Sequence, residues 1–240
     1  ENPFNLLSQV AQSLPVLRKQ LKTSLLSAAD VKSNPFAIAL LGPLARVVNR
    51  FGADFRWQHL PVPFEVYADG IDLVVFEEFG SGAAALHLRD EIERNALFSD
   101  ERYRRQFRKD YDRKFGLRVW HRDFFDAEIV SCPDESVIGK SFGQVGLDRG
   151  GLHPVDAFLD LVVEHGTKLR WRTTISNHRP EVLKKLARDD GVQMGFSDAG
   201  AHLRNMAFYN FGLRLLRHVR DAERRGEAFM TTERAVHRLT

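Results

Sequence analysis

The sequence predicts an α/β fold in which short strands alternate with helices. The prediction rests first on apolar segments of strand length, which occupy residues 127–131, 169–175 and 191–196. It rests second on the amphipathic segments of helix length that lie between and after them, at residues 154–164, 180–188, 205–220 and 232–239. Alternation of this kind is typical of parallel β-α units.

The N-terminal part of the chain has a helical pattern. Apolar residues, most of them leucine, recur at spacings of three and four over residues 4–29, which predicts a long helix. Asn34-Pro35 opens a second predicted helix that extends to about Arg50, because proline is well tolerated in the first turn of a helix.

The segment that follows predicts one strand and two more helices. Residues 71–76 form a short apolar run directly after an Asp-Gly turn signal, which indicates a buried strand. Helices are predicted over residues 83–97 and 100–115, joined through an aspartate suited to capping. We therefore expect residues 1–115 to form a largely helical elaboration and residues 116–240 to form the α/β body.

The composition is that of an ordinary folded protein. Of the 240 residues, 43% are hydrophobic and 28% are charged, and the formal net charge is +3. No apolar run approaches the roughly 20 residues that span a bilayer, so no membrane partner is expected. The single cysteine, Cys132, excludes an internal disulfide and is expected to be structural, which favours a reducing, cytoplasmic compartment.

Neither the charge distribution nor the chain ends indicate another class of function. At helical spacing the basic run Arg102–Lys109 places its aromatic residues on one face, so we expect a solvated basic face and no nucleic-acid site. The chain begins at Glu1 without a signal segment and ends at Thr240 directly after a predicted helix. Both ends are therefore expected to be cuts in a longer protein.

The most informative segment is residues 192–203, in which an apolar strand ends and Ser197, Asp198 and His202 follow in a loop rich in glycine and alanine. In barrels of alternating strands and helices, the loops at the carboxyl ends of the strands converge on one mouth, where the chemistry takes place. The carboxylate of Asp198 is therefore expected to point into that mouth. The alternative is that Asp198 caps the next turn, which is a common role of aspartate.

The segment GFSDAGAHL, at residues 195–203, and further segments in a fixed order resemble the amidohydrolase superfamily, in its subgroup of N-acyl-D-amino-acid deacylases (D-aminoacylases). The resemblance covers most of residues 60–240. Its other segments are DLVVFEE, ALFSDERYRRQF, IGKSFGQVGLDRGGLHPVDAFLDLVVE, TTISNHRPEVLKKLARDDGVQMGFSDAGAH and FMTTERAVHRLT. The resemblance implies the C-terminal strands of a partial (β/α)8, TIM-type barrel.

The resemblance also implies zinc-dependent hydrolysis of an amide C–N bond, most directly of an N-acyl-D-amino acid to a D-amino acid and a carboxylate. In such a site the metal polarises the acyl carbonyl and activates a bound water. A carboxylate takes the proton of that water and later returns it to the leaving nitrogen. The resemblance assigns this role, and a share in metal binding, to Asp198. His202 is a second catalytic candidate, which would steady the oxyanion or hold Asp198 in place; the alternative is a purely structural hydrogen-bond partner. Asn177 is a candidate for loop shaping or substrate contact.

The other metal ligands that the resemblance implies are not found in the sequence. No two histidines stand two positions apart, so the first-strand His-x-His pair of the family is absent, and a zinc site needs three or more protein ligands. The remaining candidates match no family ligand and are expected at the surface or at helix ends: His59, His87, His121, His153 and His165.

We therefore expect these 240 residues alone to bind zinc weakly or not at all and to be inactive. The longer parent would act on a small N-acyl amino acid. A barrel that is only partly closed would expose sheet edges and apolar surface, so a homo-oligomer is possible.

Two alternatives remain open at the level of sequence. One is a hydrolase of cyclic amides on the same scaffold, similar to dihydropyrimidinases or imidases, whose site residues would be the same. The other is a non-catalytic barrel or interaction protein without a metal site, which the missing histidines favour.

Overall fold

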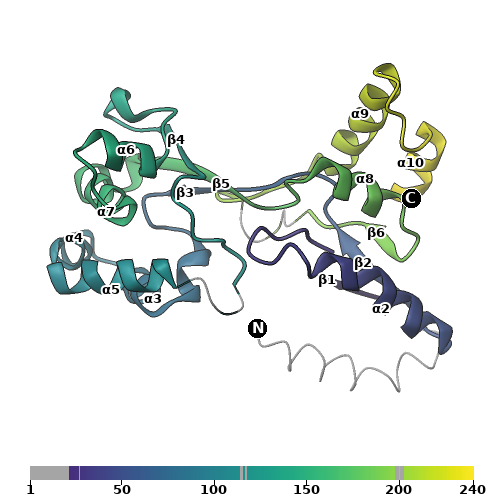
Figure 1. Ribbon diagram of the computed structural model, residues 1–240, viewed down its shortest axis with the longest axis horizontal. Helices are drawn as coiled ribbons and strands as arrows, with labels where there is room; N and C mark the ends of the chain where they lie inside the picture. The colour runs from purple at the N-terminus through teal and green to yellow at the C-terminus, as the bar shows by residue number, and fades with distance from the viewer. Residues whose placement is uncertain (1–21, 27, 114–115, 117, 198–199, 201–202) are drawn as a thin grey trace. The chain divides into compact units, whose positions relative to one another are not determined.

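The computed structural model describes residues 22–26, 28–113, 116, 118–197, 200 and 203–240. Within them the fold is mixed α/β, with two three-stranded sheets in the orders β1-β2-β6 and β3-β5-β4 (Figure 1). Neither sheet closes into a barrel in this part of the chain. The chain divides into two compact units. Unit 1 takes the described residues of Glu1–Phe64, Ser176–Leu203 and Ala207–Thr240, and unit 2 takes those of Glu65–Ile175 and Arg204–Met206.

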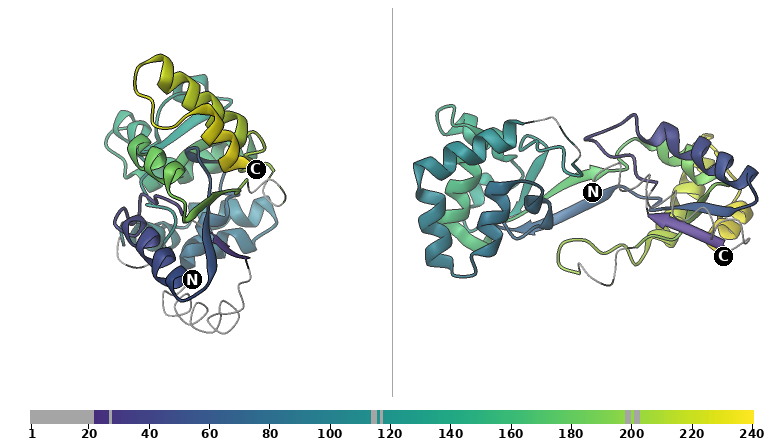
Figure 2. Two further views of the ribbon diagram at one scale, coloured as in Figure 1. Left: turned by 90° about the vertical axis from the view of Figure 1, so that its right-hand side faces the viewer. Right: turned by 90° about the horizontal axis from the view of Figure 1, so that it is seen from below.

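Unit 1 is built on a parallel sheet whose strands lie in chain order. The strands are β1 (Lys22–Leu26), β2 (Asp54–His59) and β6 (Val192–Met194), and β2 pairs in parallel with both of the others. Helix α2 (Ile38–Arg50) connects β1 to β2, and α8 (Pro180–Arg188) precedes β6. The last two helices, α9 (Phe211–Arg224) and α10 (Thr232–Leu239), lie side by side (Figure 2). The expected α/β class is thus confirmed, although β6 is the one strand of this sheet that the sequence predicts.

The sheet of unit 1 has one buried face and one polar face. Side chains alternate between the faces of a strand. Phe55, Trp57 and Val192 belong to a hydrophobic core that also includes residues of α2, α8, α9 and α10. The opposite face carries polar side chains, among them the exposed Ser24 and Arg56. A polar face is uncommon in a parallel sheet, because both sides of such a sheet are usually covered.

Most of unit 2 is one insertion in the sequence between β2 and α8. Its strands are β3 (Phe64–Asp69), β4 (Ala127–Ser131) and β5 (Arg170–Ser176), and its helices are η1 (Val74–Glu78), α3 (Gly80–His87), α4 (Glu91–Ser99), α5 (Glu101–Asp112), η2 (Glu135–Val137), α6 (Phe142–Asp148), α7 (Pro154–His165) and η3 (Gly166–Lys168). Strands β4 and β5 are antiparallel. The expectation of parallel strands is therefore wrong for this pair.

Aromatic rings fill the core of unit 2. Phe124, Phe158 and Trp171 are fully buried, and the ring centroids of Phe124 and Phe158 are 4.7 Å apart. The aromatic face of α5 is buried, as its spacing predicts. The basic run is not simply solvated, however, because Arg108 of α5 forms an ion pair with Asp156 of α7 at 2.7 Å.

Two predictions for the N-terminal half are wrong. Residues 22–26 form β1 and not the end of a helix, because pairing with β2 outweighs a helical spacing that is only a weak preference. Residues 71–76 form no strand. The chain turns at Gly70, whose φ is 58°, and then enters η1, since a short apolar run is compatible with either structure. The earlier part of the predicted helix lies outside the described residues.

The other predicted elements are found, most of them with shifted ends, and one of them is divided. The helix predicted over residues 83–97 is two helices, α3 and α4, because the carboxylate of Asp90 accepts a hydrogen bond from the N–H of Glu93 and starts a new helix. The predicted domain boundary between residues 115 and 116 falls inside unit 2 and stays a prediction. No helix in the described part of the chain has the length and apolarity that a membrane crossing requires.

Candidate functional site

The carboxyl ends of the parallel strands in unit 1 meet at one edge of the sheet. Strand β2 ends at His59 and β6 at Met194, and these two residues are partners in the register of the sheet. Asp30, His59 and Asn177 are buried polar residues at or beyond this edge. Loops that follow parallel strands converge at such an edge, and ligands commonly bind there.

Asn177 holds three loops together at this edge. Its Oδ1 accepts a hydrogen bond from the N–H of Asp30 at 3.0 Å, and its Nδ2 donates to the carbonyl oxygens of Leu60 at 2.9 Å and Val62 at 3.3 Å. Its backbone φ is 60°, in the left-handed region that asparagine tolerates better than most residues. Of the two roles expected for Asn177, these contacts favour loop shaping. A contact with substrate stays a prediction.

Asp30 is fully buried, and both oxygens of its carboxylate accept hydrogen bonds from the guanidinium of Arg179. The Arg179 Nε donates to Oδ2 at 2.7 Å, and Nη2 donates to Oδ1 and also, at 3.0 Å, to the carbonyl oxygen of Pro35. The hydrogen bond to Asp30 raises the pKa of the Arg179 guanidinium above its ordinary value. A carboxylate engaged in this paired geometry positions loops and is a poor general base.

His59 is buried and holds β2 against the chain that follows β1. Its Nδ1 lies 2.6 Å from the carbonyl oxygen of Ala28. A carbonyl can only accept a hydrogen bond, so Nδ1 carries the proton and Nε2 carries the free lone pair. Within the described residues Nε2 has no hydrogen-bond partner. Burial lowers the pKa of His59 to about 4, against the opposing effect of the hydrogen bond to Ala28, so the ring is neutral at pH 7.

The loop that follows β6 begins beside β2. The N–H of Gly195 donates to the carbonyl oxygen of His59 at 3.3 Å, and the N–H of Phe208 donates to the carbonyl oxygen of Ser197 at 2.9 Å. Both ends of the loop are therefore held by backbone hydrogen bonds near the carboxyl edge of the sheet.

Aromatic packing holds the same loop. The ring of Phe64 stacks on Phe196 with centroids 5.8 Å apart and lies 5.0 Å from the ring of Phe208. Asp198 and His202, the two predicted catalytic residues, lie outside the described residues, and their roles stay predictions.

The described residues do not by themselves form a zinc site. Among them, no three histidine, cysteine or acidic side chains are grouped so that they could hold a metal ion. At the carboxyl edge of the sheet, the carboxylate of Asp30 is engaged by Arg179 and the imidazole of His59 is enclosed. Cys132 is buried, as expected of a structural cysteine, and burial raises the pKa of its thiol.

Sequence reasoning overlooked most of this cluster. His59 was expected at the surface or at a helix end, and that expectation is wrong, because the ring is fully buried. Asp30 and Arg179 were not singled out. The signal for Asp30 was hidden by the helix predicted over residues 4–29. A strand ending at residue 26 would have placed Asp30 just beyond a carboxyl end.

The chain has long relatives in mycobacteria. It is 60% identical over 226 residues to uncharacterized proteins of Mycobacterium tuberculosis and Mycobacterium bovis, and the match covers 93% of this chain. The chain spans only 37% of the length of these relatives. No family model and no solved structure matches it. The inference of a function therefore rests on the parallel sheet, its polar carboxyl edge and the anchored loop after β6.

Proposed function

We propose that unit 1 is a segment of a (β/α)8 barrel and that it contributes Asp198 to a hydrolase of amide C–N bonds. The most direct substrate is an N-acyl-D-amino acid, a small molecule that the longer protein would meet in the cytoplasm. One observation carries the proposal: the loop that contains Asp198 starts at the carboxyl end of a parallel strand, next to the carboxyl end of β2. In α/β barrels the catalytic residues come from such strand ends.

The order of the strands supports the barrel. Strands β1, β2 and β6 are neighbours in the order in which the chain makes them, and helices pack on one side of the sheet. Both features are those of consecutive units of a (β/α)8 barrel, in which the side without helices faces inward. The polar side of the sheet, with Ser24 and Arg56, would then belong to the barrel interior.

The proposed chemistry requires a proton shuttle. An amide nitrogen leaves only when it is protonated, so the proton taken from the attacking water has to be delivered to that nitrogen. Asp198 would do both, and His202 would steady the oxyanion. Asn177 and the Asp30–Arg179 pair would hold the surrounding loops in place. Zinc is the cofactor that the resemblance implies, but the described residues do not make its site, so no step is assigned to the metal here.

The test uses a protein extended to the length of the mycobacterial relatives. Release of free amino acid is measured from N-acetyl-D-amino acids, their L-enantiomers and ring amides, together with the zinc content. We expect hydrolysis of the D-substrates. We expect Asp198→Asn to lower kcat/KM by about 10²- to 10⁴-fold, the usual contribution of a general acid-base group.

The matched control is Asp221→Asn, which removes a carboxylate from an exposed ion pair on α9 of the same unit. This variant should retain full activity. Full activity of Asp198→Asn at an unchanged melting temperature would refute the assigned proton shuttle. Turnover of ring amides alone would move the proposal to the cyclic-amide hydrolases, and no turnover of any substrate would contradict a hydrolase.

A further inference from the structure

A cavity lies at the opposite edge of the parallel sheet, where the strands begin. Its volume is about 560 Å³, within the range of small-molecule sites. The first residues of all three strands line it: Lys22 of β1, Asp54 of β2 and Val192 of β6. On β6 it extends over the whole strand as far as Met194, whereas on β1 and β2 it lies at the first residues of each strand.

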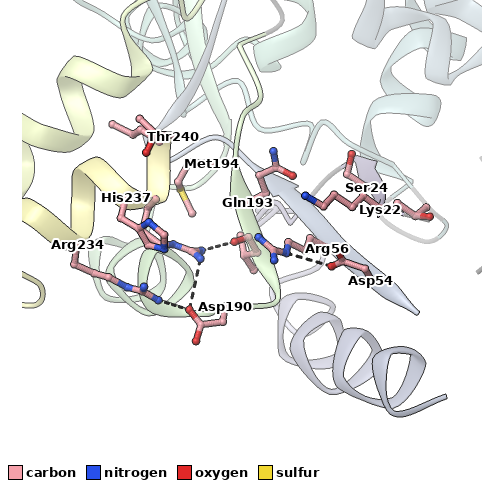
Figure 3. Close-up of a pocket in the computed structure, with 14 residues that line it drawn as sticks. Lys22, Ser24, Asp54, Arg56, Asp190, Gln193, Met194, Arg234, His237 and Thr240 are labelled. Carbon is pink, nitrogen blue, oxygen red and sulfur yellow. Dashed lines mark hydrogen bonds and ion pairs between the residues drawn. The ribbon is translucent and has the colours of Figure 1, made fainter. Parts of the chain in front are cut away.

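The described residues that line this cavity carry an excess of positive charge. They include Lys22, Arg56, Arg234 and Arg238 against the two carboxylates Asp54 and Asp190, which leaves two positive charges in excess among these six side chains. Figure 3 shows these groups on both sides of Gln193, with Lys22 and Arg56 from the strands and Arg234 and His237 from α10.

Part of this charge is fixed by contacts within the protein. The buried guanidinium of Arg238 donates to the carbonyl oxygens of Ala187 at 3.2 Å and Asp189 at 2.6 Å, which fastens α10 to the chain before β6. Arg234 pairs with Asp190, whose side chain is 80% exposed. These contacts build the helical wall of the cavity.

The two cationic side chains on the strand side of the cavity make fewer contacts within the protein. Arg56 is half-exposed, and its Nε is 3.6 Å from Asp54, which is beyond the length of a good hydrogen bond. Lys22 is exposed and has no ion-pair partner among the described residues. Both cations sit on the polar face of the sheet, beside the exposed amide of Gln193, and both can turn toward a ligand.

We propose that this cavity binds a small molecule through a doubly charged oxyanion group, such as a phosphate group, held by Lys22 and Arg56. Planar guanidinium groups match the geometry of phosphate oxygens, and a lysine ammonium adds a point charge. Gln193 offers an uncharged amide donor between them. The volume leaves space for the body of a ligand as well as for its anionic group.

The site does not depend on the proposed hydrolase activity. Binding is measured by isothermal titration calorimetry of the full chain with inorganic phosphate, and in parallel with acetate, at constant ionic strength. We expect saturable binding of phosphate with one site and weaker binding of the singly charged acetate. The double variant K22Q/R56Q should bind phosphate at least tenfold more weakly, because it loses two charge-assisted contacts. Asp198→Asn should bind phosphate as the unchanged protein does.

The matched control is Arg220→Gln on α9. Arg56 and Arg220 both have side chains that are 52% exposed, and each lies beside one aspartate. Arg220→Gln should leave phosphate affinity unchanged, and an equal loss in this variant would overturn the proposal. Should K22Q/R56Q fail to fold by circular dichroism, Gln193→Glu puts a negative charge in the cavity and must weaken binding at least tenfold. Binding of phosphate that never saturates would also refute the site.

Discussion

Removing the buried imidazole of His59 should abolish a specific part of the pH dependence of stability. His59→Asn is the informative change. The Nδ2 of asparagine lies where Nδ1 of histidine lies, so the hydrogen bond to the carbonyl oxygen of Ala28 can be kept while the titrating ring is lost. The variant leaves a small void next to β2, which lowers stability by an amount that does not vary with pH.

The magnitude follows from the lowered pKa. In the folded protein burial holds the pKa of His59 at about 4, and in the unfolded chain it returns to about 6.5. As the pH falls below about 6.5, the unfolded chain takes up a proton that the folded protein refuses, so the free energy of unfolding falls. The stability associated with neutral, buried His59 is fully present above pH 6.5 and is lost progressively as the pH falls toward 4. Each pH unit in this window is worth up to ~1.4 kcal/mol, which gives about 3 kcal/mol in all.

The measurement is hydrogen exchange of peptides that cover β2 and β6. A local readout is needed because two compact units can open separately. Unchanged protein and His59→Asn are compared at the same pH from 4 to 7.5, so the intrinsic exchange rates cancel. We expect the unchanged protein to lose about 3 kcal/mol of opening free energy relative to the variant as the pH falls through this window. Two parallel pH profiles would show that His59 is not buried as described.

Two further predictions concern packing. Asn177→Ala and Asn177→Gly should both destabilise unit 1, because each leaves buried backbone groups of Asp30 and Leu60 without a partner, at a cost of about 1–3 kcal/mol for each group. Hydrogen exchange should show alanine to be worse than glycine by about 1 kcal/mol, since only glycine accepts a φ of 60° without strain; equal losses would mean that the backbone relaxes. Gly82→Ala should destabilise unit 2 by about 1–3 kcal/mol in urea unfolding, because an added Cβ would lie 2.2 Å from the carbonyl oxygen of Phe76. Gly80→Ala in the same helix meets no atom within 4 Å and should be neutral or slightly stabilising, since alanine is the better helix former. An equal loss in both variants would show that the contact with Phe76 is not the cause.

The sequence predicts elements best where local signals agree. Strand β4 and helices α8 and α10 are found over the predicted residues. Each of the two helices combines a clear period with a cap or a proline at its start. Strand β1 was missed because its helical spacing competes with pairing to β2, and that pairing involves residues about thirty positions apart. The parallel or antiparallel sense of each strand pair is also decided by distant contacts, which no local period encodes.

In the candidate site, too, local signals can be predicted from the sequence and distant contacts cannot. The segment after β6 can be found from its residues alone, because a carboxylate among small residues after an apolar strand is a local signal. The cluster of Asp30, His59 and Arg179 could not be found in that way. Its members are 29 to 149 residues apart in the chain, and each is unremarkable until the fold buries it. Burial places the carboxylate of Asp30 against Arg179 and the ring of His59 against the carbonyl oxygen of Ala28.

The position of Asn177 explains how so long an insertion fits between two neighbouring strands. Adjacent parallel strands need a crossover, and the one between β2 and β6 contains unit 2. The strands by which the chain enters and leaves that unit, β3 and β5, are neighbours in one sheet, so the chain returns close to where it left. Asn177 follows β5 directly, and its Nδ2 binds the carbonyl oxygens of Leu60 and Val62 just before β3. One side chain thus joins the outgoing and returning connections at the carboxyl edge of the parallel sheet.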